Sequence, residues 1–482
     1  MAGIGFELRD LFAGKGLFRK MNAVLVSSFV TVGPSLFCMG AIAFLQVYMR
    51  RTQIRVPERE LFLSLLTYAF IFSLVLTGGV ALTASRYVSN RLFKGERDAI
   101  LPSLYGTLLF LLAFVGAIAA LFLAGLPLPV SDRVAAWYLV MLLSAIWLES
   151  VYLSAIHGHR YLAGAFIVGM LVGMGGCVGL LALHRMPESL AMLIGMDIGF
   201  AFILGAFHMK LLRSFGCFRS TLRVCLNWMS ELDQYPQLPF IGFLYYVGLY
   251  SHNFTYWAGS SGRWLQGNLR FAPGYDMPSF VAILSIFPAL VYLVVRFETS
   301  LATQCRIYYE MASGQGSIQD IRMAGHGLIA TVESELELFM RLQLIVTLIA
   351  LFIGIRVLPL IGASFQVVDV FSALTLGNFG FICLYAVCLI LLYLDDRAGA
   401  FLLLAMFNVL AIGLSVLAQW MGDAFQGVGY VAAAMLTLPF ALLWLSRRLG
   451  DLECRTFAHQ PVYRAPSRSL LQRIHTLIPR KE

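Results

Sequence analysis

Long apolar stretches recur along the whole chain, and they constrain the fold more than any other feature. Each has about 20 residues or more, the length that an α-helix needs to cross the hydrocarbon core of a bilayer. Twelve such stretches occur, at residues 22–48, 61–84, 101–124, 134–156, 161–183, 190–212, 236–257, 279–297, 338–358, 366–394, 398–420 and 427–446. The pattern predicts an all-α membrane protein with twelve transmembrane helices.

The spacing of the stretches divides the chain into two halves of six helices. A basic connection at 213–235 separates the first half, 22–212, from the second, 236–446. The predicted layout is completed by an amphipathic N-terminus at 1–21, a cytoplasmic loop at 298–337 and a basic tail at 447–482. Composition agrees with a membrane protein, because 59% of the residues are hydrophobic and only 13% are charged, against about 25% charged in soluble domains.

Most of the 35 Lys and Arg residues lie in connections on one side of the predicted membrane. By the positive-inside rule these connections are cytoplasmic, which predicts that both termini are cytoplasmic. The first outer connection is an exception, because it carries Arg50, Arg51, Arg55 and Arg59. Because the net charge of +9 is spread over short connections, it indicates topology and contact with membrane lipids, and no nucleic acid partner.

Motifs for enzymatic chemistry and for metal binding are missing from the sequence. The eight cysteines form no C-x-x-C pair, which argues against a zinc site or a disulfide framework. The sequence contains no G-x-x-x-x-G-K-[ST] phosphate loop, and no connection is long enough for a catalytic domain. We therefore expect no catalytic residue, no metal and no cofactor.

The stretch at 236–257, PQLPFIGFLYYVGLYSHNFTYW, is unusually polar for a transmembrane helix. At helical spacing its polar and aromatic residues occupy two neighbouring faces, one with Tyr246, Tyr250, Asn253 and Trp257 and the other with Tyr245, His252 and Tyr256. Polar groups inside a membrane face a partner helix or water. We interpret this helix as the lining of an aqueous path for carbohydrate. The alternative is an aromatic belt at the membrane surface with ordinary helix packing.

Five charged residues lie in or near the apolar stretches: Glu149, Asp197, Arg296, Arg356 and Asp369. We expect Arg296 to lie at the membrane boundary, where its side chain can reach the surface, and consider the other four here. Each would cost about 2.5–3.5 kcal/mol if it faced lipid, so we expect all four to face inward. They are candidates for the lining of a substrate path or for proton coupling. The alternative for each is a buried hydrogen bond that fixes the orientation of a helix.

The N-terminal sequence resembles that of a known family. Residues 1–12, MAGIGFELRDLF, and the sequence Val-Gly-Pro-Ser at 32–35, together with the two predicted six-helix halves, resemble the PelG family of Pel exopolysaccharide transporters. That family is similar to the polysaccharide flippases of the MATE-like multidrug/oligosaccharidyl-lipid/polysaccharide (MOP) exporter superfamily. The resemblance implies a MATE/MOP-flippase-like fold, and it carries over no catalytic residue.

The resemblance also implies a function and partners. A protein of this kind moves a growing amino-sugar polymer, rich in N-acetylgalactosamine, from a cytosolic glycosyltransferase to the periplasm across the bacterial inner membrane. The expected partners are that glycosyltransferase (PelF-like), a cyclic-di-GMP receptor (PelD-like) and a scaffold subunit (PelE-like), with 298–337 as a docking place. Two other functions stay open: a cation-coupled exporter of drugs or lipid-linked oligosaccharides, and a non-transporting membrane scaffold for the glycosyltransferase.

Overall fold

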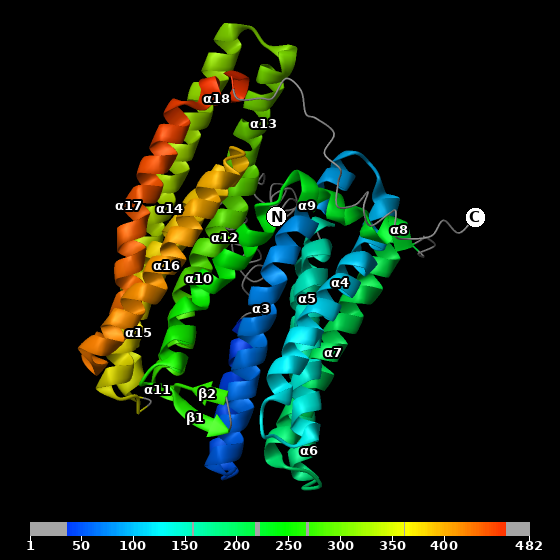
Figure 1. Cartoon of the computed structure of the whole chain (residues 1–482), viewed down its shortest axis with the longest axis vertical. Coiled ribbons are helices and arrows are strands. Elements are labelled where there is room, and N and C mark those ends of the chain that lie inside the picture. Colours follow the sequence, from blue (N-terminus) through cyan, green and yellow to red (C-terminus); the bar gives the residue numbers. More distant parts are fainter. Residues whose placement is uncertain (1–35, 157–158, 217–221, 267–268, 361, 459–482) are drawn as a thin grey trace, which may run out of the picture.

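The computed structural model describes residues 36–156, 159–216, 222–266, 269–360 and 362–458. In Figure 1 the helices form two bundles side by side. The first bundle consists of a helix over 36–51 and of α3 (Val56–Phe93), α4 (Ile100–Ala124), α5 (Val130–Ala155), α6 (His159–Ala182) and α7 (Glu188–Phe215). The predicted amphipathic segment at 1–21, the Val-Gly-Pro-Ser sequence and the end of the basic tail lie outside the described residues.

The second bundle follows a short linker. Its helices are α10 (Leu238–Ala258), α11 (Pro273–Ala282), α12 (Phe287–Arg296), α14 (Ile318–Leu360), α15 (Phe365–Tyr393), α16 (Arg397–Met421) and α17 (Val428–Gly450), with the short α18 (Leu452–Ala458) after them. The linker contains α8 (Leu222–Cys225) and α9 (Ser230–Gln234). An antiparallel hairpin of β1 (Arg263–Gln266) and β2 (Leu269–Phe271) follows α10. We call the two ends of the molecule the hairpin end and the linker end (Figure 1).

Several helices begin where the sequence places a residue suited to a helix start. Pro57, Pro239 and Pro273 occupy the first turn of α3, α10 and α11, where the missing N–H would have no partner in any case. Ser364 caps α15 by accepting a hydrogen bond from the Val367 amide. Asp396 caps α16 in the same way, with its Oδ1 atom 3.1 Å from the Gly399 nitrogen.

Within the described residues, ten helical segments are long and apolar enough to cross a membrane. The chain is therefore a multi-pass membrane protein. Two predicted spans are not among the ten: the helix over 36–51, whose predicted first part lies outside the described residues, and α10, whose tyrosine, histidine and asparagine side chains lower its hydropathy. The structure confirms the all-α membrane class, and the number twelve stays a prediction.

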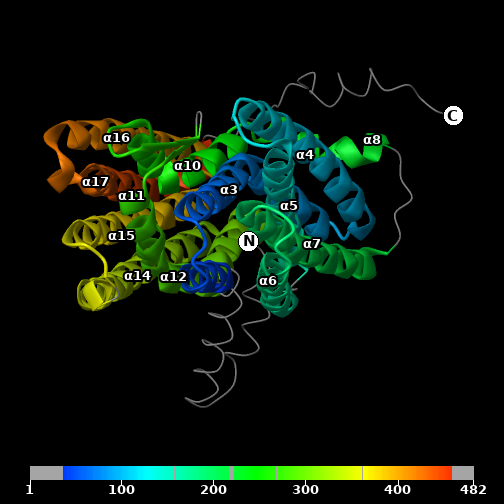
Figure 2. The ribbon, with the colours of Figure 1, turned by 90° about the horizontal axis from the view of Figure 1, so that it is seen from below.

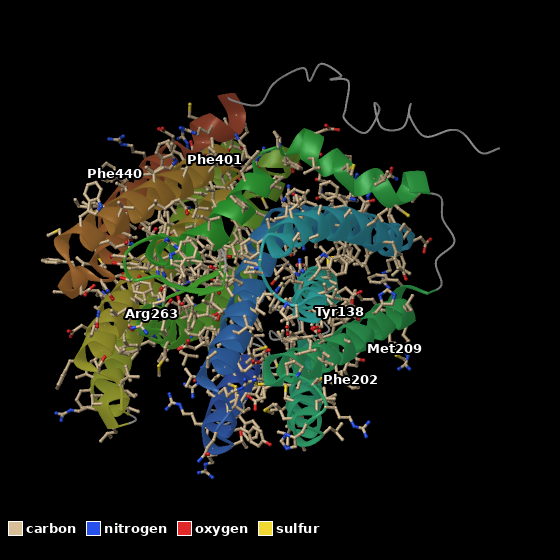
Figure 3. The ribbon with its side chains drawn as sticks, turned by 60° about the horizontal axis from the view of Figure 1, so that its bottom comes forward. Tyr138, Phe202, Met209, Arg263, Phe401 and Phe440 are labelled. Atoms are coloured by element: carbon tan, nitrogen blue, oxygen red, sulfur yellow. The ribbon has the colours of Figure 1, made fainter. Side chains whose placement is uncertain are left out.

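The outer surfaces of the bundles are apolar, as contact with lipid requires. In the apolar membrane-spanning part of each helix, only 22% of the residues of α14 and 28% of those of α4 are buried, against 78% for the central α15. Large exposed side chains include Phe202 and Met209 on α7, Phe401 on α16 and Phe440 on α17 (Figure 3). Because water would disfavour so large an apolar surface, the helix exteriors belong in a bilayer.

Helices α3 and α10 bring the two bundles into contact, and Figure 2 shows them side by side between the bundles. Their backbones touch at glycines. A Cβ atom on Gly78 would lie 2.7 Å from the Gly242 carbonyl oxygen, and one on Gly79 would lie 2.7 Å from the Pro239 carbonyl oxygen. Only a glycine fits at such a distance, which is how small residues bring membrane helices together. We call the whole boundary between the two bundles, along α3 and α10, the seam.

Residues 298–337, the predicted cytoplasmic connection, form two helical arms. α12 continues through η4 (Phe297–Leu301) into α13 (Ala302–Glu310), and α14 begins at Ile318 and runs for 43 residues. At 1.5 Å per residue α14 is about 64 Å long, twice the hydrocarbon thickness. A capping box begins this helix. The Ser317 amide donates to the Asp320 carboxylate at 2.9 Å, and the Asp320 amide donates to the Ser317 hydroxyl at 3.3 Å.

Candidate functional site

Three tyrosines of α10, Tyr245, Tyr246 and Tyr250, are half-buried. Tyr246 points at α3, because a Cβ atom on Gly78 would clash with its ring. Tyr245 points into the second bundle, where its ring centre lies 4.2 Å from that of Tyr385 on α15. Tyr250, one turn further along α10, is also half-buried. By contrast, Phe243 on the outer face of α10 is 40% exposed. The tyrosines thus follow the seam, and their use by a substrate stays a prediction.

An aromatic cluster closes the seam at the hairpin end. The Tyr68 ring of α3 stacks on the Trp257 ring of α10 at 4.4 Å and 8°, and Phe72 contacts Phe254 beside them at 5.7 Å. The Tyr68 hydroxyl donates a 2.8 Å hydrogen bond to the Arg270 carbonyl oxygen of β2. Ring stacking and this hydrogen bond therefore connect α10 and the hairpin of the second bundle to α3 of the first.

A second contact joins the bundles at the linker end. Two guanidinium groups lie over the ring of Tyr235, just before α10: Arg86 of α3 at 5.1 Å and Arg397 of α16 at 4.6 Å. Cations over an aromatic face are attracted by its negative potential. Because Arg86 and Arg397 belong to different bundles, Tyr235 links the two at this end.

Asn253 and Trp257 are buried against Asp276 of α11, a residue that sequence reasoning missed. Asp276 accepts hydrogen bonds from Asn253 Nδ2 at 3.0 Å and from Trp257 Nε1 at 2.8 Å, and a third from the Ala272 amide at 3.1 Å. His252, one residue earlier on α10, is buried and pairs with the Tyr275 hydroxyl at 3.0 Å. This network favours the alternative of ordinary helix packing for these residues in this conformation.

Glu149 takes part in a hydrogen-bonded chain across three helices of the first bundle. Its Oε1 atom lies 2.8 Å from Nδ1 of His208 on α7, and His208 Nε2 lies 2.9 Å from the hydroxyl of Tyr105 on α4. The Glu149 side chain is 1% exposed and that of His208 is 30% exposed. The arrangement can pass a proton between a buried carboxyl group and a more accessible imidazole.

Asp197 is buried without a hydrogen-bond partner for its Oδ1 atom. It lies in a groove of about 600 Å³ between α5 and α7, among apolar neighbours such as Val134, Tyr138, Ile194 and Ile198. Val134 and Ile198 are 57% and 45% exposed, so the groove opens on the outside of the bundle. The Asp197 side chain is buried, and both its inward orientation and its role stay predictions.

Arg356 and Asp369 are exposed, so the expectation that they face inward is wrong. Arg356 lies four residues before the end of α14, with its guanidinium 6.0 Å from the Phe352 ring centre. Asp369 lies in the second turn of α15. Both are close enough to a helix end for the charged group to reach the membrane surface, where it is not buried in lipid.

Sequence reasoning missed the partners of the predicted residues: Asp276, His208, Tyr105 and Arg270. Asp276 lies in the connection predicted between the stretches 236–257 and 279–297, and His208 lies in a predicted span like Glu149. A search for every titratable residue within the spans would have found His208. Within the ranges that the structure describes, no group of three or more His, Cys, Asp and Glu residues is placed to hold a metal ion.

The fold is that of MATE-type transporters. A MATE transporter in the straight conformation is similar with a TM-score of 0.61 at 12% identity, covering 89% of this chain and 96% of that one. An outward-facing multidrug resistance MATE transporter of the MOP superfamily has a TM-score of 0.57 at 13% sequence identity, and the match covers 94% of this chain and 100% of that one. A MOP superfamily transporter from Pyrococcus furiosus has a TM-score of 0.58 at 13% identity, and the match covers 89% of this chain and 96% of that one. These likenesses show that the chain shares the fold of these transporters.

The family is shown by the sequence itself. The family model of the PelG exopolysaccharide exporters (EPS-E) matches residues 1–457. The chain belongs to the PelG exopolysaccharide exporter family, which confirms the resemblance of its N-terminal sequence. Among curated proteins, none matches the chain.

Replacing Asp197 by leucine should stabilise the protein, whereas the same change at Asp276 should destabilise it. Asp197→Leu removes a buried polar group that lacks a partner, a defect that costs about 1–3 kcal/mol. Asp276→Leu leaves three donors without an acceptor and should cost about 3 kcal/mol. Thermal unfolding of the purified variants in detergent measures both changes. A lower unfolding temperature for Asp197→Leu than for the wild type would show that this carboxyl group has a partner.

Proposed function

We propose that the chain moves a growing amino-sugar polymer, rich in N-acetylgalactosamine, from a cytosolic glycosyltransferase to the periplasm along the seam between its two bundles. Membership of an exopolysaccharide exporter family and the transporter fold support this function. The observation that carries it is the position of Tyr245, Tyr246 and Tyr250, half-buried on the helix that joins the bundles. Tyrosine offers an apolar ring to a sugar face and a hydroxyl group to its edge.

The linker end is the cytoplasmic side in this proposal, and the membrane is the bacterial inner membrane. The distribution of basic residues supports this orientation. The helical arms formed by α13 and α14 extend at that end (Figure 1) and give a docking place for the PelF-like glycosyltransferase, beside the PelD-like receptor and the PelE-like scaffold. Arg296 of α12 anchors the base of the arms by donating from Nε to Glu335 of α14 at 2.9 Å.

Removing the three tyrosine hydroxyls together should slow polymer translocation by about tenfold or more. Tyr245→Phe, Tyr246→Phe and Tyr250→Phe keep the rings but lose groups worth about 1 kcal/mol per hydrogen bond, and 1.4 kcal/mol is a factor of ten. The measurement is the polymer that appears inside sealed vesicles containing the purified chain and the glycosyltransferase, supplied outside with UDP-N-acetylgalactosamine.

The matched control changes two rings on the outer face of the same helix, Phe240→Leu and Phe243→Leu, which should leave translocation unchanged. Translocation at the wild-type rate by the triple phenylalanine variant would contradict the tyrosine path. If the wild-type chain supports synthesis but no polymer enters the vesicles, the chain acts as a membrane scaffold and the transport proposal fails.

A second candidate function is cation-coupled export of a lipid-linked oligosaccharide or a drug by the same fold. The chain of Glu149, His208 and Tyr105 favours it, because a proton bound there can alter the packing of α4, α5 and α7. In that case the two bundles would alternate access around a site between them. Elongation of the polymer by its synthase needs no such proton site.

Dependence on a proton gradient separates the two functions. If elongation drives export, polymer entry into vesicles should continue at an unchanged rate after the gradient is dissipated with an uncoupler, and Glu149→Gln should change it less than twofold. Loss of entry both with the uncoupler and in Glu149→Gln would establish the cation-coupled exporter instead. Protein levels and thermal unfolding of the variant serve as the control for folding.

A further inference from the structure

A small pocket lies at the hairpin end, where the two bundles meet. Its volume is about 260 Å³, and its lining includes Pro57, Glu60, Arg263, Trp264, Phe271 and Pro273. The first two residues belong to α3 of the first bundle, and the others belong to the hairpin and α11 of the second. Figure 3 shows Arg263 on the hairpin, at the boundary between the bundles. We call this site the hairpin pocket.

The hairpin pocket holds two charged groups of opposite sign that are free to bind a ligand. Arg263 is exposed and Glu60 is half-buried. Among the residues that the structure describes, neither side chain has a hydrogen-bond or ion-pair partner. The carboxylate only accepts hydrogen bonds, and the guanidinium only donates them. A free anion would be repelled by Glu60 and a free cation by Arg263, so the pair suits a neutral ligand that is rich in both donors and acceptors.

The rest of the pocket is apolar and partly aromatic. Trp264 is 59% exposed, which is unusual for the largest aromatic side chain. The guanidinium of Arg270 covers one face of its ring at 3.9 Å and is held there by a 3.2 Å hydrogen bond to the Trp257 carbonyl oxygen. Within the described part of the chain, no aromatic ring or other cation contacts the Trp264 ring, so its opposite face can receive the apolar face of a ligand.

A saccharide unit has the chemistry that this pocket matches. Its ring carries an apolar face of C–H groups and an edge of hydroxyl groups, which act both as donors and as acceptors. The volume is below the range of about 300–1,000 Å³ that is typical for drug-sized ligands, so it suits a single unit. The pocket also lies directly beside the Tyr68 and Trp257 stack that closes the seam.

We propose that the hairpin pocket binds one neutral saccharide unit of the polymer as it leaves the seam, with Glu60 accepting from its hydroxyl groups, Arg263 donating to its oxygens and Trp264 contacting its ring. The inference rests on the proposed function, and it adds a binding site outside the seam. Because both bundles line the pocket, separation of the bundles at the hairpin end takes the site apart and releases the unit.

Binding of a neutral N-acetylgalactosamine oligosaccharide to the full chain in lipid nanodiscs, measured by titration calorimetry, tests the proposal. The double variant Glu60→Ala, Arg263→Ala should bind at least tenfold more weakly than the wild type, and so should Trp264→Leu. The matched control, Arg185→Ala with Asp423→Ala, removes one exposed arginine and one exposed carboxylate outside the pocket and should leave the affinity unchanged.

An unchanged affinity in the double variant, or an equal loss in the control, would overturn the hairpin pocket as a saccharide site. So would a wild-type chain that binds no oligosaccharide at millimolar concentration. The vesicle assay on the same preparation keeps this result apart from the proposed function. Polymer that enters vesicles without oligosaccharide binding overturns only the pocket, whereas failure of polymer to enter overturns the transport proposal.

Discussion

The close approach of α3 and α10 is the contact on which the arrangement of the two bundles depends. Gly78, Gly79 and Gly242 let two backbones meet at van der Waals distance, and a membrane gives no hydrophobic force that could replace such a fit. The contacts at either end of the seam follow from this approach. Tyr68 reaches Trp257 at the hairpin end, and Arg86 reaches Tyr235 at the linker end. These end contacts are stacked rings and cation–ring pairs, which can separate and form again as the bundles move.

The buried carboxyl groups of the bundles differ in how many of their oxygens have a hydrogen-bond partner. This difference distinguishes groups with a structural role from candidates for a functional one. Asp276 has a donor for both of its oxygens, so it fixes α11 against α10. Asp197 has an unpaired oxygen, and Glu149 is paired through one oxygen to a partly exposed histidine while its Oε2 has no partner. A buried unpaired carboxyl group costs free energy. The first bundle thus holds the less completely paired acids.

The all-α membrane class, the family and most helices could be predicted from the sequence. The length of an apolar stretch and the motif at residues 1–12 are local features, which can be recognised without knowing how the chain packs. The sequence did not reveal which helix face meets which partner. Periodicity placed Asn253 and Trp257 on one face of α10, but only the packing of α11 brings Asp276 to them. Arg356 and Asp369 already lie near the ends of the predicted stretches 338–358 and 366–394, and the expectation of inward orientation overlooked this position. Hydropathy also ended α14 at the membrane boundary, whereas the helix continues beyond it.

Separation of the bundles at the hairpin end is the central event in this account, and a reversible cross-link there tests it most directly. Pro57 of α3 and Leu265 of β1, which also lines the hairpin pocket, belong to different bundles, so Pro57→Cys and Leu265→Cys place one thiol on each bundle. With Cys217 and Cys454 replaced by serine, the remaining native cysteines are buried. A cleavable bifunctional thiol reagent should stop polymer entry into vesicles, and cleavage should restore it to the level of the untreated variant. Unchanged polymer entry with the cross-link in place would contradict the account.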